Sequence, residues 1–158
     1  MSGAAAIPAG FVRISFPPSP FVEMTGPMYG RRESGDFTLG FIVLPKHCNA
    51  AGVCHGGMIA TVCDMLLTVG SNIQSGQSRF LPTISMTCDF LAGAKEGAWL
   101  EGRVTVLRVT RNLLFASAVL EGADGPVARA SGVMKVAGEP DPRFHPDRYF
   151  ETDRAAGA

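Results

Sequence analysis

The chain has 158 residues, of which 46% are hydrophobic and 18% are charged, so it is long enough for one folded domain with a core of its own. Its 14 basic and 14 acidic residues balance, which gives no electrostatic reason to expect a nucleic acid or a membrane surface as partner. No apolar run approaches the length of a membrane span, and the first residues lack the pattern of a signal peptide. The 4 cysteines have no CxxC spacing, so we expect free thiols and a cytoplasmic protein.

The first third of the chain predicts little regular structure before one strand. Residues 1–20 are rich in Ala, Gly and Pro, and we expect a flexible lead-in. Residues 21–28 favour a short helix or a packed turn, and the charged run 31–36 favours a turn. Residues 37–44 alternate and are rich in β-formers, which predicts a first strand that Pro45 ends.

Residues 58–73 predict one long helix that is apolar around most of its circumference. At 100° per residue one face carries Ile59, Val62, Cys63, Leu66, Gly70 and Ile73. The polar stripe is narrow and consists of Thr61, Asp64, Thr68 and Ser71. Such a helix has to be covered on most sides, so the rest of the fold should wrap around it.

Four alternating stretches follow the helix, at residues 83–91, 98–109, 113–122 and 126–136. The short connections between them predict hairpins and an antiparallel sheet. The expected fold is therefore α+β, with an antiparallel sheet of five to six strands wrapped around a long central helix. We expect one domain over residues 21–137 and a surface or mobile tail over residues 138–158. One sheet covers only one side of a helix, so we also expect self-association.

Asp64 is the only acidic residue from Phe37 to Cys88. Acids seldom lie in so apolar a segment without a partner or a purpose. A structural interpretation remains open, in which local hydrogen bonds from Thr61 or Thr68 satisfy a buried carboxylate. The functional interpretation is that Asp64 acts as a base or a nucleophile.

The start of the helix is a second candidate for chemistry. Gly56, Gly57 and Met58 should present unpaired backbone N–H groups there, aided by the helix dipole. Two glycines let a ligand approach, so this end could stabilise a developing oxyanion, although a tight turn explains the glycines equally well. Asp64 lies eight residues on, roughly 12 Å along the axis. The two could act on one carbonyl only if two antiparallel helices met across a two-fold axis.

Two other chemistries have weaker support. His47, Cys48, Cys54 and His55 could suggest zinc, but adjacent ligand pairs do not fit the usual spacing, and we expect no metal. A Cys–His nucleophile made from His55 with Cys54 or Cys63 is also unfavourable, because the neighbours Cys54 and His55 seldom face each other and Cys63 falls on the apolar face of the helix.

The spacing of the polar loop, the glycines and the acid resembles that of the hotdog-fold acyl-CoA thioesterases of the phenylacetate-pathway (PaaI-type) family. The matching positions are Asn49, Gly52, His55, Gly56, Gly57 and Asp64. The resemblance extends over about residues 21–136, including the strand that begins near Thr83 and the strand around residues 128–132. It implies a hotdog fold and a homodimer or a dimer of dimers with sites at the interface.

The resemblance also implies roles for single residues. Asp64 matches the catalytic base or nucleophile, and Gly56 matches the residue whose amide polarises the thioester carbonyl. His55 and Asn49 match residues that shape the site, and Thr83 matches a Ser or Thr that orients the water or the carboxylate.

Further residues are candidates for contact with substrate. Those expected beside the acyl group are Gly57, Met58, Met65 and Phe90. Those that could meet the phosphates of coenzyme A are Arg108, Arg111 and Asn112. Ser85 departs from the family, many members of which have an acid there.

The sequence thus predicts hydrolysis of an acyl- or aryl-CoA thioester, with no cofactor other than the coenzyme A of the substrate. Two alternatives are a non-catalytic acyl-CoA-binding module and a hotdog dehydratase acting on hydroxyacyl thioesters. A third is an apolar scaffold in which Asp64 is merely buried.

Overall fold

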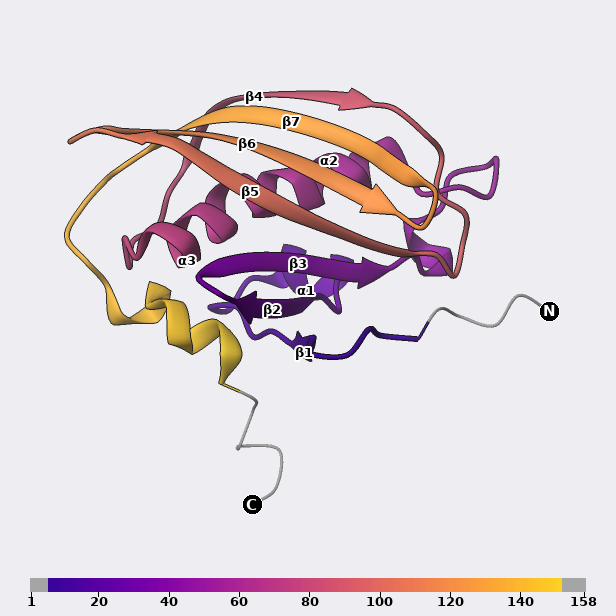
Figure 1. Cartoon of the computed structure of the whole chain (residues 1–158), viewed down its shortest axis with the longest axis horizontal. Coiled ribbons are helices and arrows are strands. Elements are labelled where there is room, and N and C mark those ends of the chain that lie inside the picture. The colour runs from indigo at the N-terminus through magenta and orange to yellow at the C-terminus, as the bar shows by residue number, and fades with distance from the viewer. Residues whose placement is uncertain (1–5, 152–158) are drawn as a thin grey trace, which may run out of the picture.

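The computed structural model describes residues 6–151, which form one antiparallel sheet curved over a central helical segment (Figure 1). The strands are β1 (Val12–Arg13), β2 (Tyr29–Glu33), β3 (Asp36–Ile42), β4 (Thr83–Phe90), β5 (Trp99–Val109), β6 (Leu113–Gly122) and β7 (Gly125–Lys135). Their order across the sheet is β1-β2-β3-β5-β6-β7-β4. The predicted fold is confirmed, but the sheet has seven strands instead of the expected five to six, because the short strands β1 and β2 extend it beyond β3.

The central segment runs from Gly56 to Ser75 without a break. It consists of α2 (Gly56–Met65), a π-helical turn (Leu66–Gly70) and α3 (Ser71–Ser75). The predicted apolar face is buried along its whole length. A π turn takes in one residue more than an α turn and so rotates the residues after it. This change accounts for the burial of Ser71, which the uninterrupted α-helical period placed in the polar stripe.

The sheet approaches the central segment closely at the π turn. A Cβ built on Gly102 of β5 would lie 2.5 Å from Leu66, and one on Gly132 of β7 would lie 2.9 Å from Leu67. Both leucines are fully buried. The two glycines therefore leave the space that these side chains occupy, which fixes the helix against the inner face of the sheet.

The expectation that no apolar run approaches the length of a membrane span is wrong for the central segment. Its 20 residues are long and apolar enough to cross a membrane, with a mean hydropathy of 1.3 over the best 18-residue window. Of that window, 61% is buried inside the fold. Core helices of this kind pass the same test, and the sheet that covers the segment accounts for its composition.

The charged run at residues 31–36 is not simply a turn. Its first half belongs to β2, and only Ser34 and Gly35, both with positive φ, form the hairpin turn to β3. Arg31 lies over the Phe11 ring and Arg32 over the Phe150 ring, each 4.6 Å from the centroid. Charged side chains can occupy this strand because their guanidinium groups stack on aromatic rings from both flanks of the chain.

Both flanks pack on the domain where the structure describes them. Before β2, β1 pairs with the sheet and α1 (Pro20–Thr25) forms the predicted short helix. After β7 come two 3-10 helices, Pro142–Phe144 and Pro146–Phe150, and Tyr149 in the second is buried. The expectation for residues 1–5 and 152–158 lies outside the described residues. The domain limits of 21 and 137 stay a prediction.

Candidate functional site

Asp64 and Thr83 meet in the structure. Asp64 is half-buried on α2, and Thr83 begins β4, one of the two edge strands of the sheet. The Thr83 hydroxyl donates a hydrogen bond to Asp64 Oδ1 at 2.5 Å. A hydrogen bond to a charged carboxylate is short and strong, and it fixes the orientation of the acid.

The local hydrogen bonds do not explain the carboxylate. Thr61 Oγ1 donates to the carbonyl of Gly57 at 2.9 Å, and Thr68 Oγ1 donates to the backbone carbonyl of Asp64 at 2.8 Å. Neither hydroxyl reaches the carboxylate. Within residues 6–151, Thr83 is its one hydrogen-bond donor, so Oδ2 has acceptor capacity left for a water or a substrate.

A cavity of about 230 Å³ lies beside this carboxylate. The central segment and the loop that leads to β4 supply part of its lining, namely Asp64, Met65, Thr68, Val69, Asn72, Arg79, Phe80, Leu81, Pro82 and Thr83. The two flanks supply the rest, namely Phe16, Pro17, Val22, Phe144 and Tyr149. An acid at the edge of a mainly apolar cavity is the arrangement expected of a site for a small apolar group.

The start of α2 presents one free backbone donor. The His55 ring caps the helix, with Nδ1 accepting from the N–H of Gly57 at 2.8 Å, and the His55 carbonyl accepts from the N–H of Met58 at 2.9 Å. The N–H of Gly56 has no hydrogen-bond partner in the described part of the chain. Phe90 lies beside it, 3.4 Å from where a Gly56 Cβ would be. The helix start thus has one amide available to an anion or a polarised carbonyl.

The loop before the helix is held by Asn49. Its Oδ1 accepts from the N–H groups of Ala51 at 2.9 Å and Val53 at 3.4 Å, and Gly52 takes a positive φ of 72°. The His55 N–H donates to the carbonyl of His47 at 2.7 Å. These bonds fix where the chain enters the helix, and hence where the Gly56 amide points.

His47 supports this loop from inside the protein. Its Nδ1 accepts from the N–H of Leu44 at 3.1 Å, and its Nε2 lies 2.8 Å from the carbonyl of Thr25, so the neutral ring donates there. Burial lowers the pKa of His47 below its ordinary value. Both ring nitrogens are occupied, and the role of His47 is structural.

Residues 51–128 match the family described as the thioesterase superfamily. The protein PA0474 of Pseudomonas aeruginosa PAO1, which carries the provisional name of an esterase, is 31% identical over 129 residues, or 81% of this chain and 96% of the relative. The chain belongs to the thioesterase superfamily. This membership supports thioester hydrolysis as the general activity.

Solved structures agree on the fold. The phenylacetic acid degradation protein PaaI from Thermus thermophilus superposes with a TM-score of 0.63 at 19% identity, over 74% of this chain and 98% of that one. A hypothetical thioesterase from Streptococcus pneumoniae TIGR4, solved with coenzyme A, gives 0.65 at 20% identity, over 83% and 98%. The protein smu.793 of Streptococcus mutans UA159, bound to acetyl CoA, gives 0.63 at 22% identity, over 87% and 96%. At these identities the likeness establishes the hotdog fold.

A single chain of this thioesterase-superfamily member keeps the two parts of the candidate site apart. Gly56 and Asp64 stand on one continuous α-helix, so eight residues separate them by roughly 12 Å along its axis. Met65 lines the cavity at Asp64, whereas Met58 is buried in the core and Phe90 is exposed beside Gly56.

The residues expected to meet coenzyme A lie at the β5–β6 hairpin and do not line the cavity beside Asp64. Arg108 is exposed near the end of β5, and Arg111 and Asn112 are exposed in the turn to β6. The strand register aligns this end of the hairpin with Thr83, at the far end of β4 from Phe90. Their role in binding stays a prediction.

The thiols of Cys54 and Cys63 are poorly suited to nucleophilic catalysis. Burial raises the pKa of Cys54 to about 11 and that of Cys63 to about 12, so both remain protonated near neutral pH. The backbones of Cys48 and Cys54 pair in an isolated antiparallel β-bridge. All four cysteines are free thiols, with no disulfide between them. Within residues 6–151, no three His, Cys, Asp or Glu side chains gather as a metal site would require.

Sequence reasoning missed the cavity walls outside the central segment. They include Phe16 from the lead-in and Phe144 and Tyr149 from the tail, which were expected to lie outside the domain, and Val22 from α1. The signal available was the presence of large aromatic residues in both Pro-rich flanks, since a segment with no packing role has little need of them.

Proposed function

We propose that this protein is an acyl-CoA thioesterase, which hydrolyses an acyl- or aryl-CoA thioester to the free acid and coenzyme A. The observation that carries the proposal is the Asp64 carboxylate, oriented by Thr83 at 2.5 Å in the lining of an apolar cavity of about 230 Å³. An acid beside an apolar cavity, in a chain of the thioesterase superfamily, supports the proposal.

The chemistry needs two kinds of group, and the chain has both. As general base, Asp64 takes a proton from the water that attacks the thioester carbon. As nucleophile, its oxygen attacks that carbon directly, and water then hydrolyses the resulting acyl–aspartyl anhydride to the free acid. Either attack puts negative charge on the carbonyl oxygen. The Gly56 N–H, at the positive end of the helix dipole, is the donor proposed to stabilise that charge until the coenzyme A thiolate leaves.

The proposed site uses two copies of the chain, because about 12 Å of helix separates its two parts. One side of the molecule supports this assembly. β4 is an edge strand, and Ile84, Phe90 and Leu91 at or just beyond its ends are each more than half exposed. The same strand supplies Thr83, which binds Asp64, and Phe90, which lies beside Gly56. A second copy placed there by a two-fold axis would cover the apolar residues and bring each Gly56 toward the other Asp64.

The proposal that coenzyme A is the thiol part of the substrate is supported by two proteins of the same fold. The Streptococcus pneumoniae structure contains coenzyme A, and the Streptococcus mutans protein is bound to acetyl CoA. In this chain Arg108, Arg111 and Asn112 remain the proposed contacts for its phosphates, since they are exposed and two of them are positively charged.

The test is release of free thiol from a panel of acetyl-, medium-chain, long-chain and aryl-CoA thioesters. Turnover of at least one of them by the wild-type protein is the expected result. Binding of an acyl-CoA with a measurable Kd but no thiol release would contradict the proposal and favour a binding module. Formation of an enoyl thioester from a hydroxyacyl-CoA, without thiol release, would favour a dehydratase.

A further inference from the structure

Part of the wall of the cavity beside Asp64 comes from segments that lie outside the region matched to the family. That region covers residues 51–128, whereas Phe16 and Val22 precede it and Phe144 and Tyr149 follow it. The cavity is therefore bounded in part by the two flanking segments of the chain.

These flanking segments form an ordered aromatic wall. The rings of Phe16 and Tyr149 meet edge to face with centroids 6.0 Å apart, and those of Phe80 and Phe144 lie 5.7 Å apart. Asn72 of α3 donates a hydrogen bond through Nδ2 to the carbonyl of Phe144 at 2.7 Å. The tail is thus tied to the central segment, and the wall has a defined position relative to Asp64.

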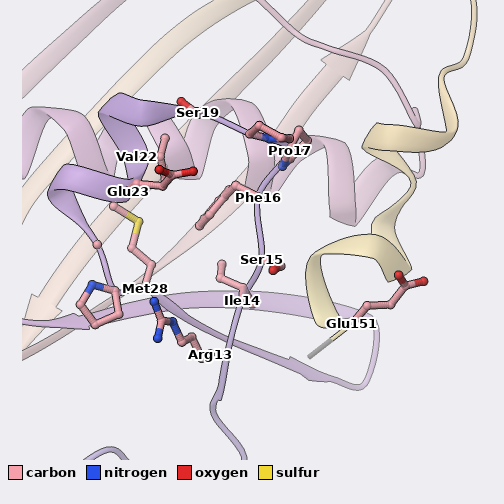
Figure 2. Close-up of a pocket in the computed structure, with 13 residues that line it drawn as sticks. Arg13, Ile14, Ser15, Phe16, Pro17, Ser19, Val22, Glu23, Met28 and Glu151 are labelled. Atoms are coloured by element: carbon pink, nitrogen blue, oxygen red, sulfur yellow. The ribbon is translucent and has the colours of Figure 1, made fainter. Parts of the chain in front are cut away.

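A second and larger cavity lies on the other side of part of this wall. It has a volume of about 640 Å³ and extends beneath α1 along the lead-in (Figure 2). Three residues, Phe16, Pro17 and Val22, line both cavities. Figure 2 shows the Phe16 ring between α1, which carries Val22, and the segment that carries Ile14. Phe16 is the largest of the three shared side chains, so its ring is the main partition between the two spaces.

We propose that Phe16 sets the size of the acyl group that this protein accepts, by closing the cavity at Asp64 against the larger cavity under α1. This inference rests on the proposed thioesterase function. With Phe16 in place the substrate is a compact acyl group. About 230 Å³ exceeds the roughly 150 Å³ that is known to hold a benzene molecule, but not by enough for a long chain. Without the ring, a longer chain could continue into the space of about 640 Å³.

The proposal predicts a change in selectivity rather than a uniform loss of rate. Each methylene accommodated or rejected by an apolar pocket changes kcat/KM by about 10-fold or more. Phe16→Ala should therefore raise the ratio of kcat/KM for a long-chain acyl-CoA to that for a short-chain acyl-CoA by at least about 10-fold. Phe16→Leu keeps an apolar side chain and should give a smaller shift in the same direction.

The experiment measures thiol release from straight-chain acyl-CoAs of increasing length, for the wild type and for Phe16→Ala, Phe16→Leu and Phe21→Ala. Phe21 is the matched control, because it lies on α1 nearby, is 57% exposed and lines neither cavity. Thermal unfolding of each variant checks that it folds, and Phe16→Leu carries the test if Phe16→Ala does not.

A shift toward longer chains in the Phe16 variants, with Phe21→Ala unchanged, supports the proposal. An unchanged length profile, an equal loss at all lengths, or the same shift in Phe21→Ala would overturn it while leaving the thioesterase function intact. Absence of turnover of every thioester by the wild type would overturn the proposed function and this inference together.

Discussion

The two ends of the proposed chemistry are built in different ways. At the start of α2 the functional group is a backbone N–H, and its position is set by neighbours in sequence, namely the His55 cap and the Asn49 loop. In the middle of the helix the group is the Asp64 side chain, which is held by Thr83 from a distant strand. The cavity beside it is walled by residues from both flanks of the chain. One half-site therefore depends on local structure and the other on tertiary packing.

The largest effect is expected from the side chain of Asp64. Asp64→Asn keeps the shape of the residue but removes the base or nucleophile, so kcat should fall by about 10²–10⁴-fold. Asp89→Asn is a matched control, since Asp89 lies on β4 and is an exposed partner of Arg129. Steady-state thiol release measures both. A variant at Asp64 that is as active as the wild type would remove this residue from the mechanism.

Removing the hydroxyl of Thr83, the β4 residue that binds Asp64, should have a smaller effect on kcat. Thr83→Val deletes the hydroxyl that orients the carboxylate, and a hydrogen bond to a charged group contributes enough to lower kcat by about 10-fold to 10²-fold. Thr83→Ser retains the hydroxyl and should keep most of the activity. Equal kcat values in Thr83→Val and Thr83→Ser would mean that the contact with Asp64 has no part in catalysis.

A substitution at the start of α2 is expected to change the stability of the folded protein. His55→Ala removes the cap on the N–H of Gly57, which should cost about 1 kcal/mol and lower Tm by about 2–4 °C. Asn is a good capping residue, so His55→Asn should recover most of the loss. Differential scanning calorimetry of the three proteins measures this. If both variants had the wild-type Tm, the hydrogen bond from Gly57 would not be what stabilises this end.

The smallest effect is a dependence of stability on pH that comes from His47. Burial depresses the pKa of His47 in the folded protein below the ordinary value of 6.5, so on acidification the unfolded chain takes up a proton first. Stability is retained above about pH 6.5 and is lost as the pH falls from there toward the folded-state pKa.

Denaturant unfolding from about pH 7.5 to about pH 5.5 should show a steeper loss for the wild type than for His47→Gln. His145→Gln is the control, because His145 is exposed in the tail. The same slope in all three proteins would show that His47 is not responsible.

The sequence predicted the parts of the fold in which local pattern and final structure agree. Strands β4 to β7 follow their alternating residues closely, because one face of each packs on the helix. β2 was missed because Arg31 and Arg32 suggested a turn, whereas the rings of Phe11 and Phe150 cover them in the strand. No local pattern records that contact, since the partners come from opposite ends of the chain.

The same distinction holds for the candidate site. The loop, the glycines and Asp64 lie within 16 residues and were identified by their spacing, and the resemblance added Thr83. Phe16, Phe144 and Tyr149 were not identified, because their nearness to Asp64 arises only when both flanks fold back.

The most direct test of the proposed two-chain site is complementation in mixed dimers. One chain carries Asp64→Ala and the other Gly56→Val, whose side chain would crowd the amide at the helix start; each alone should be nearly inactive. If the site combines Gly56 of one chain with Asp64 of the other, the purified heterodimer has one intact site and recovers about half of the wild-type activity. No recovery, despite demonstrated exchange of subunits, would contradict a site shared between two chains.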